Sequence, residues 1–254
     1  MQTPASVLAG ILRSDPARPR VTFYEDTPGP TRGERIELSG KVLANWVAKA
    51  GNALQDEYDL GPGSLVRLAL PPHWRALYWA LAVWSVGGTV DCSVDNTVDN
   101  TVDCTMGQSP DLLICHDPAA IAATGDPAPG DVVLVTLASL ARAHPGPVPA
   151  GAMDEARELA TYGDQFTAVA EPDPDELALI IDGEQTAYRG VVRRQDWPAD
   201  ARVNLAGDLA RVLESTLAAW AVDGSVVLAR NGLHAGGEPQ PERLASERVT
   251  LDLA

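Results

Sequence analysis

Histidine is the residue type in this chain best suited to acid–base chemistry, so its placement is the first clue to a site. The four histidines are His73, His116, His144 and His234. His73 follows two prolines at the predicted end of a strand, where ligands of α/β proteins often bind. With the adjacent Trp74 it could line a pocket, although a histidine at such a position is more commonly exposed at the start of a helix.

The serines and glycines form no nucleophile or phosphate motif of known spacing. Ser39 and Ser64 lack the G-x-S-x-G context of a nucleophile elbow, and the sequence G-x-x-x-x-G-K-[ST] is absent. The Gly-x-Gly at 61–63 precedes a predicted strand, whereas a dinucleotide-binding turn follows one. Because these motifs are absent, the serines and glycines give no candidate for a catalytic residue.

Cysteine usage indicates reduced thiols. Cys92, Cys104 and Cys115 are an odd number of cysteines in a chain long enough to fold without disulfides. A metal site could be built from them and His116, but zinc ligands are normally paired at C-x₂₋₄-C spacing, which these residues lack. We expect buried or incidental thiols and no metal site.

Four acidic tetrads, VDCS-VDNT-VDNT-VDCT, occupy residues 90–105. One interpretation is a ladder of carboxylates that binds a divalent cation. A calcium loop, however, needs alternating acidic positions, a glycine and a distal glutamate, and that pattern is absent. We favour a surface insertion that grew by repetition.

The charge balance limits the possible partners. A formal net charge of -16, from 35 acidic and 19 basic residues, opposes binding to nucleic acid or to an anionic membrane. No apolar run approaches the roughly 20 residues needed to span a bilayer, and the first residues lack the apolar core of a signal peptide. We therefore expect a cytoplasmic protein. Because 45% of its residues are hydrophobic, we also expect it to be globular.

Apolar spacing between residues 35 and 91 predicts a helix, a strand, a second helix and a second strand. The first helix includes Trp46 and Leu54, and the first strand covers 65–70. The second helix, 77–86, is closed by Gly87-Gly88, and the second strand begins at Thr89-Val90.

This pattern is repeated later in the chain, with a strand at 203–207, a helix that contains Trp220, and a strand near 226. Such units bury both faces of their strands only when helices cover a mostly parallel sheet. We therefore predict an α/β fold with two similar halves. The first half, 1–150, includes the acidic tetrads and ends at the proline-rich segment 144–149, and the second half is 151–254.

Segments 60–72 and 85–90 resemble the opening of the adenylate-forming superfamily, which includes AMP-dependent synthetases/ligases, acyl-CoA synthetases, peptide-synthetase adenylation domains and luciferases. The superfamily pattern G-(V/L)-x-x-G-D-x-V-A-(L/I)-x-L-P-N is matched by LGPGSLVRLALPP, with Ser64 in place of the aspartate. No proline follows Gly87-Gly88 as it does in the superfamily. Segment 242–250 is similar to the helix-to-strand passage I-x-x-x-x-V-T. The resemblance implies the amino-terminal α/β fold of these enzymes, and the whole chain resembles an actinobacterial family that keeps only this first part.

In the superfamily, the loop T-S-G-(S/T)-T-G-x-P-K-G follows a strand and holds the phosphates of ATP. The resemblance places the equivalent position after the predicted strand 177–181, with Asp182, Gly183, Thr186 and Arg189 as degenerate cofactor-binding residues. No lysine is present there. Asp182 and Glu184 would each repel a phosphate by about 1 kcal/mol or more at close range, unless Mg²⁺ bridged them.

The cations near this position are arginines. Arg189, Arg193 and Arg194 could form a residual phosphate clamp, or they could simply be the basic face of an exposed helix. Segment 203–208 offers no general acid or base where the superfamily has an aromatic or histidine motif. Enzymes of the superfamily continue into a barrel-like subdomain and a lid that carries a catalytic lysine. This sequence contains neither.

Three functions remain open. The first is a non-catalytic relic, a pseudoenzyme without a cofactor that binds an unknown small ligand or a protein. The second is a divergent acyl-adenylating enzyme that uses ATP and Mg²⁺, with an arginine in place of the lysine. The third is a structural or regulatory subunit, for example a homodimer. We favour the first because the residues that would perform adenylation are missing.

Overall fold

The computed structural model describes residues 2–93, 109–123, 130–231 and 241–254. They form two compact units. Unit 1 contains Met1–Val47, Pro71–Tyr78 and Val192–Ala254, and unit 2 contains Ala48–Leu70 and Trp79–Val191. Each unit takes segments from both sides of residue 150. The predicted boundary between two similar halves at residue 150 stays a prediction. The two compact units are divided differently, because each combines segments that are distant in the sequence.

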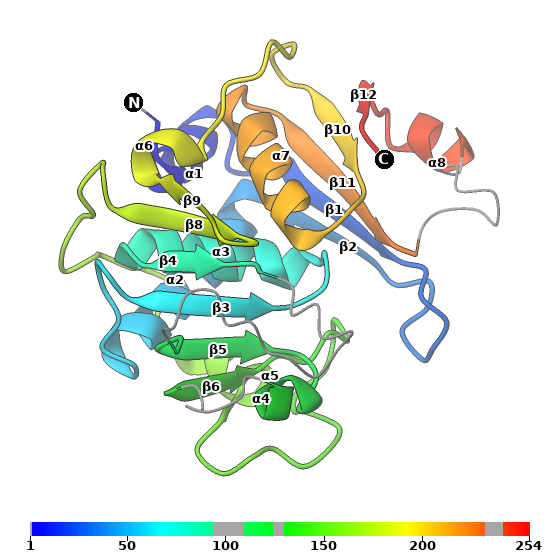
Figure 1. Ribbon diagram of the computed structural model, residues 1–254. Coiled ribbons are helices and arrows are strands. Elements are labelled where there is room, and N and C mark those ends of the chain that lie inside the picture. The colour runs from blue at the N-terminus through cyan, green and yellow to red at the C-terminus, as the bar shows by residue number, and fades with distance from the viewer. Residues whose placement is uncertain (1, 94–108, 124–129, 232–240) are drawn as a thin grey trace. The chain divides into compact units, whose positions relative to one another are not determined.

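Unit 1 is built on a five-stranded sheet in the order β12-β10-β11-β1-β2 (Figure 1). All neighbouring strands are parallel except the edge strand β2, which runs antiparallel to β1. The strands are β1 (Pro19–Glu25), β2 (Arg35–Ser39), β10 (Arg202–Leu205), β11 (Ser225–Arg230) and β12 (Leu251–Asp252). The helices that lie wholly in this unit are α1 (Pro4–Ser14), α7 (Leu209–Ala221) and α8 (Pro241–Ser246).

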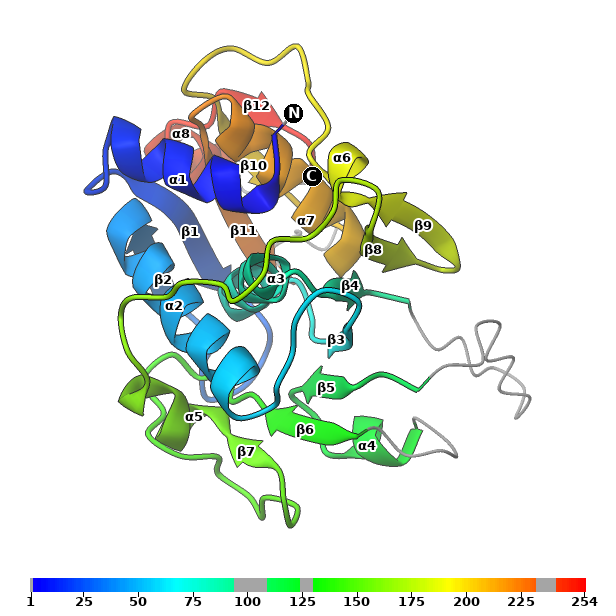
Figure 2. The same ribbon diagram turned by 90° about the vertical axis from the view of Figure 1, so that its left-hand side faces the viewer.

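A buried arginine joins α1 to the beginning of β11 in unit 1. Arg20 on β1 is 0% exposed. Its guanidinium donates to the carbonyl oxygens of Asp223, Gly224 and Ile11 at 2.6, 3.1 and 3.4 Å, and forms an ion pair of 2.7 Å with the Asp223 carboxylate. A buried charge is tolerated only with such partners, so Arg20 fixes the positions of these three segments. Figure 2 shows α1 beside α7, against which it packs.

Unit 2 is built on a seven-stranded sheet in the order β7-β6-β5-β3-β4-β8-β9. It is parallel throughout except for the edge strand β9, which pairs antiparallel with β8. The strands are β3 (Leu65–Ala69), β4 (Thr89–Asp91), β5 (Leu112–Cys115), β6 (Asp131–Leu134), β7 (Met153–Asp154), β8 (Leu177–Ile181) and β9 (Glu184–Ala187). Its short helices are α4 (Ala119–Ala123), α5 (Glu155–Glu158), the 3-10 helix η1 (Leu159–Thr161) and α6 (Tyr188–Val191).

Two longer helices, α2 (Gly40–Asp56) and α3 (Trp74–Val86), contribute to both units. Every residue of α3 from Trp74 to Trp84 is buried, which agrees with the continuous apolar sequence of this helix. Both helices confirm the elements predicted from spacing, and the predicted α/β class is confirmed by the two largely parallel sheets. No helix in the described part of the chain is long and apolar enough to cross a membrane.

Polar side chains of α2 hold η1 and the irregular segment 162–169 of unit 2. Lys49 Nζ donates to the carbonyl oxygens of Ala160 and Tyr162, at 3.1 and 2.5 Å. Further along the helix, Asn52 Nδ2 donates to two carbonyl oxygens, at residues 163 and 165, and Gln55 Oε1 accepts from the backbone of Val169 at 3.0 Å. These bonds satisfy backbone groups that no strand or helix pairs.

The predicted internal repeat is visible in the turns that follow α3 and α7. The backbone N–H of Gly88 donates to the oxygen of Val83 at 2.9 Å, and that of Gly224 donates to Ala219 at 2.8 Å. The following residue then donates to the carbonyl oxygen just before the preceding strand, Thr89 to Ser64 and Ser225 to Ala201, both at 2.8 Å. The two strand-helix-strand segments therefore share the same turn construction.

Candidate functional site

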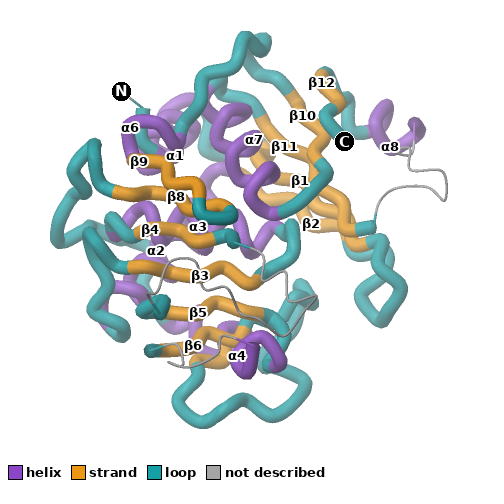
Figure 3. The backbone as a smooth tube through the Cα atoms, viewed as in Figure 1, coloured by secondary structure: helices purple, strands orange, loops and turns teal. Residues whose placement is uncertain are grey.

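The position predicted to hold phosphate is the turn of a tight hairpin. Residues Ile181 and Glu184 pair across β8 and β9, so Asp182 and Gly183 alone connect the strands (Figure 3). Their φ angles are 46° and 85°, as a two-residue type I′ turn requires. The strand β9, which begins at Glu184, was not predicted from the sequence.

This turn does not have the composition of a triphosphate site. A phosphate cradle needs several converging backbone N–H groups and a cation. Here two residues, one of them a carboxylate, replace the ten-residue loop that the resemblance implies. Thr186 lies within β9, where it pairs with Leu179 and does not reach around a loop. The four candidate residues thus belong to one hairpin and its adjoining helix, but their chemistry does not fit ATP with Mg²⁺.

The nearby arginines have acidic partners of their own. Arg189, in α6, forms an ion pair with Asp175, and its side chain is 64% exposed. Arg193 pairs with Glu214 of α7 at 3.1 Å, and Arg194 is exposed. All three arginines are exposed, as the interpretation of a basic helix face expected, but only Arg189 lies in a helix.

His73 is buried, so the expectation of an exposed histidine is wrong. It is 1% exposed and its ring lies 4.3 Å from that of Phe23. Its Nδ1 accepts from the backbone N–H of Arg75 at 3.2 Å at the beginning of α3. Trp74, Trp46 and Tyr78 extend this aromatic group, with ring separations of 5.6 to 6.3 Å. The group is part of the hydrophobic core of unit 1.

The other residues considered for chemistry have structural roles. Ser39 Oγ accepts from the backbone of Val42 at the start of α2, and Ser64 Oγ accepts from Gly61. Cys92 and Cys115 are buried and are not in a disulfide, and burial raises the pKa of Cys115 to about 11, with a smaller contribution from Asp117.

The remaining metal candidates lie partly outside the described residues. Cys104 and the tetrads from residue 94 onward are among the undescribed residues, while Asp91 pairs with Arg67 at 2.8 Å. Within the described ranges, no group of three or more His, Cys, Asp or Glu side chains is arranged to hold a metal ion.

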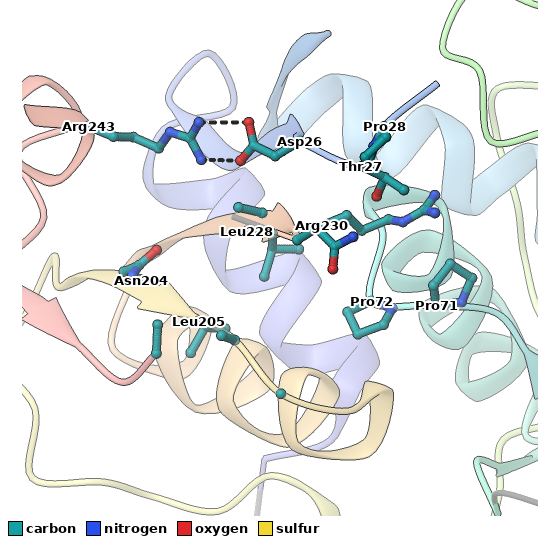
Figure 4. A pocket seen from close by; sticks show the side chains of 15 residues that line it. Asp26, Thr27, Pro28, Pro71, Pro72, Asn204, Leu205, Leu228, Arg230 and Arg243 are labelled. Carbon is teal, nitrogen blue, oxygen red and sulfur yellow. Dashed lines mark hydrogen bonds and ion pairs between the residues drawn. The ribbon is translucent and has the colours of Figure 1, made fainter. Parts of the chain in front are cut away.

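A pocket of about 660 Å³ lies in unit 1, at the carboxyl ends of its parallel strands (Figure 4). Such strand ends are the usual ligand position in open α/β sheets. The residues that follow β1, β10 and β11 all contribute to its wall. The lining residues are Asp26, Thr27, Pro28, Pro71, Pro72, Asn204, Leu205, Ala206, Gly207, Leu228, Ala229, Arg230, Asn231, Arg243 and Ala254.

The charges around this pocket are paired. Arg230 Nη1 lies 3.0 Å from Glu25 Oε2, and the other carboxylate oxygen of Glu25 accepts from the backbone N–H of Thr27 at 2.9 Å. Arg243 makes two parallel hydrogen bonds to Asp26, at 2.6 and 2.9 Å. Figure 4 shows both arginines at the pocket above an apolar surface that includes Leu205 and Leu228.

A buried amide contributes a polar group to the pocket wall. Asn204 is 6% exposed, and its Nδ2 donates to Asp252 Oδ1 at 2.8 Å. The pocket thus combines an apolar surface with Asn204, Thr27 and two guanidinium groups, which suits binding of a small organic molecule. From the sequence, segment 203–208 around Asn204 offered no acid or base, and Pro71, Pro72 and Arg243 were noted without a link to a pocket.

The fold is that of the amino-terminal part of adenylate-forming enzymes. The Brucella canis acyl-CoA synthetase structure matches with a TM-score of 0.72 at 16% identity, covering 98% of this chain and 47% of that protein. Apo MatB from Rhodopseudomonas palustris matches with a TM-score of 0.68 at 16% identity, covering 99% of this chain and 49% of MatB. The N-terminal domain of FACL13 from Mycobacterium tuberculosis matches with a TM-score of 0.66 at 11% identity, over 99% of this chain and 62% of that one. The chain spans about half the length of the first two structures.

A full-length relative defines the family. A TIGR03089 family protein of Mycobacterium tuberculosis is 33% identical over 265 residues, which cover 98% of this chain and 99% of the relative. The chain therefore belongs to the TIGR03089 family. No family model matches the sequence. The predicted resemblance to the adenylate-forming superfamily and to an actinobacterial family is confirmed by these matches.

Proposed function

We propose that this protein is a non-catalytic, adenylate-forming-like binding module that holds a small organic ligand in the pocket of unit 1. The observation that carries the non-catalytic part is the Asp182–Gly183 turn, because two residues leave no room for a phosphate-binding loop. The pocket supports the binding part, since it lies where strand ends of an α/β sheet commonly meet a ligand.

Electrostatics argue in the same direction. The hairpin carries Asp182 and Glu184 at the position of the loop, and Arg189 is already paired with Asp175. A triphosphate there would meet two carboxylates before it met a cation. Each close pair of like charges would cost about 1 kcal/mol or more at an exposed site.

The non-catalytic part is tested by an assay of exchange between pyrophosphate and ATP. The purified full chain is incubated with Mg²⁺ and each of a panel of carboxylic acids. We expect no exchange across a panel of carboxylic acids and no calorimetric heat with Mg²⁺-ATP. Steady exchange with any acid would contradict the proposal and favour a divergent adenylating enzyme, the alternative raised by the sequence.

The binding part is tested by a thermal-shift screen with AMP, coenzyme A, acyl-adenylate mimics and a panel of small organic compounds. A ligand that binds only the folded state raises the melting temperature by mass action. We expect the shift to disappear in Ala206→Leu, which fills the pocket, and to persist in Gly190→Ala, which lies in α6. An equal shift in both variants would place the ligand elsewhere.

A structural subunit would behave differently in solution. Sedimentation at several protein concentrations distinguishes it, since a homodimer dissociates on dilution whereas a binding module of this size need not self-associate. The structural-subunit alternative would be favoured by two results together: a dimer that still forms in the pocket variants, and a ligand screen without a hit.

A further inference from the structure

The helix α8 is attached to unit 1 by a charged side chain, Arg243. None of its six residues is buried. Arg243 of this helix makes the two hydrogen bonds to Asp26 and places its guanidinium 4.2 Å from the centre of the Tyr24 ring. A helix of this length would not be stable alone, so these contacts decide whether it remains in place.

A second charged attachment follows α8 directly. Glu247 is 8% exposed and accepts hydrogen bonds from Arg35 at 2.9 and 3.1 Å, and also from Tyr24 and Arg202. These donors come from β2, β1 and β10, so one carboxylate holds the end of α8 against three strands. Arg35 is shared with Glu37, which it contacts at 2.9 Å.

The same contacts form part of the pocket. Asp26 and Arg243 both line it, and Figure 4 shows Arg243 reaching from α8 to Asp26 at one side of the cavity. Movement of α8 would therefore withdraw Arg243 from the pocket lining and break its bonds to Asp26, whereas β1, β10 and β11 are held by backbone ladders.

Charge pairs and apolar contacts respond to salt in opposite ways. Salt weakens interactions between charges, with a screening length of about 10 Å at roughly 0.1 M, although it weakens a partly buried pair such as Arg243–Asp26 less than an exposed one. Burial of apolar surface, which holds α7 through side chains such as Leu213 and Leu217, is not weakened by such screening. The attachment of α8 should consequently depend on ionic strength much more than that of α7.

We propose that α8 is a lid on the pocket of unit 1, closed by the Arg243–Asp26 pair and the contacts of Glu247, and opened when these charge pairs are weakened. The role of the lid rests on the proposed ligand-binding function of the pocket. Its opening is a property of the protein alone and can be measured without a ligand.

Hydrogen exchange of the full chain tests the opening. The amides of Glu247, Arg248 and Val249 are protected by bonds to carbonyl oxygens of α8, at 2.9 to 3.1 Å. We expect Asp26→Asn and Arg243→Gln each to raise their exchange about 2- to 5-fold at low salt, and added NaCl to do the same in the wild type. Glu214→Gln, which breaks a pair with the exposed Arg193 far along the chain from α8, should leave them unchanged. Exchange that is insensitive to Asp26→Asn, to Arg243→Gln and to salt would overturn the proposal.

Access to the pocket is measured separately with Ala206→Cys, whose thiol would lie in the pocket wall. Its alkylation by iodoacetamide, followed by mass spectrometry of the peptide, should accelerate when Asp26→Asn is added and not when Glu214→Gln is added. Equal rates in the two double variants would contradict a lid. Acceleration without any hit in the ligand screen would keep the lid and reject the proposed binding function.

Discussion

Trp84 and Trp220 make the same hydrogen bond in the two units. Trp84 Nε1 on α3 donates to the carbonyl oxygen of Ala178 at 2.7 Å, and Trp220 Nε1 on α7 donates to that of Arg20 at 3.2 Å. Each acceptor is the second residue of its strand, β8 or β1. Each of these strands pairs in parallel with the strand that follows the tryptophan's helix.

The equivalence explains how each sheet recruits a strand from a distant part of the chain. A buried indole N–H needs an acceptor, and in both units the acceptor belongs to a strand outside the local strand-helix-strand segment. The tryptophans are therefore part of what fixes β8 beside β4 and β1 beside β11.

Replacing either tryptophan by phenylalanine should destabilise the protein by about 1–3 kcal/mol, since it leaves a buried carbonyl oxygen without its donor. The free energy of unfolding in urea measures the effect. Trp74→Phe is the matched control, because the buried Trp74 Nε1 has no hydrogen-bond partner among the described residues. A cost for Trp74→Phe as large as that for Trp84→Phe would show that ring volume, not the hydrogen bond, matters.

The sequence predicted local elements well because their signals are local. Helix α3 follows from a continuous apolar run closed by Gly87-Gly88, and β8 from the run LALII. The strand order could not be predicted in the same way. The pairing of β1 with β11 joins segments near opposite ends of the sequence, and no pattern within either strand specifies its neighbour.

The hairpin at Asp182 was missed because only half of its signal was present. An Asp-Gly pair between two β-forming runs indicates a type I′ turn, and here the pair follows the run LALII but precedes EQTA, which is not β-forming. The resemblance to a phosphate loop drew attention to charge and composition at this position. The length of the connection matters more for the proposed function, because two residues between β8 and β9 cannot form a phosphate-binding loop.

The pocket could be predicted only in part. Carboxyl ends of strands mark candidate sites, so segment 204–207 could have been selected on position alone. Asp26, Arg230 and Arg243 become neighbours only through the sheet order and the placement of α8. Their pairing depends on tertiary structure that the sequence pattern does not encode locally.

The turn geometry of the hairpin leads to a contrast between two glycines. Gly183 has a φ of 85°, so Gly183→Ala should cost about 1–2 kcal/mol, measured by urea unfolding. Gly190 has no positive φ, and a Cβ there would meet its nearest neighbour, in Thr186, at an ordinary 3.5 Å. Gly190→Ala should therefore be neutral or slightly stabilising, and equal losses in the two variants would contradict the turn assignment.

The repeated turn after α7 leads to a sharper prediction. A Cβ on Gly224 would lie 2.3 Å from the oxygen of Ala201 and 2.7 Å from that of Ala219, both backbone atoms that cannot move aside easily. Gly224→Ala should cost about 3 kcal/mol or more. Gly10→Ala, in α1, meets nothing within 4 Å and should stabilise by about 0.5–1 kcal/mol. Thermal unfolding of both variants measures the difference, and a mild effect at Gly224 would mean that the turn differs from the structure.

The carboxylate of Glu247 should make stability depend on acid. Burial alone would raise its pKa, but hydrogen bonds from Tyr24, Arg202 and Arg35 outweigh burial and hold the pKa below the ordinary value of 4.5. A depressed pKa in the folded state gives a contribution that is fully present above the unfolded pKa and is lost as pH falls through the folded one. The wild type should therefore be more stable than Glu247→Gln by a constant amount from neutral pH down to about pH 5, and this difference should shrink below it.

The measurement is urea unfolding of both proteins from about pH 7 to about pH 3. Glu214→Gln serves as the control, because its exposed partner Arg193 lies in water and the pair should contribute little at any pH. If the difference between the wild type and Glu247→Gln stayed constant to the lowest pH, Glu247 would have the same pKa in the folded and unfolded states. That result would mean that its three donors do not shift its protonation. If the difference vanished near neutral pH, the carboxylate would titrate above its ordinary range, and burial would outweigh the hydrogen bonds.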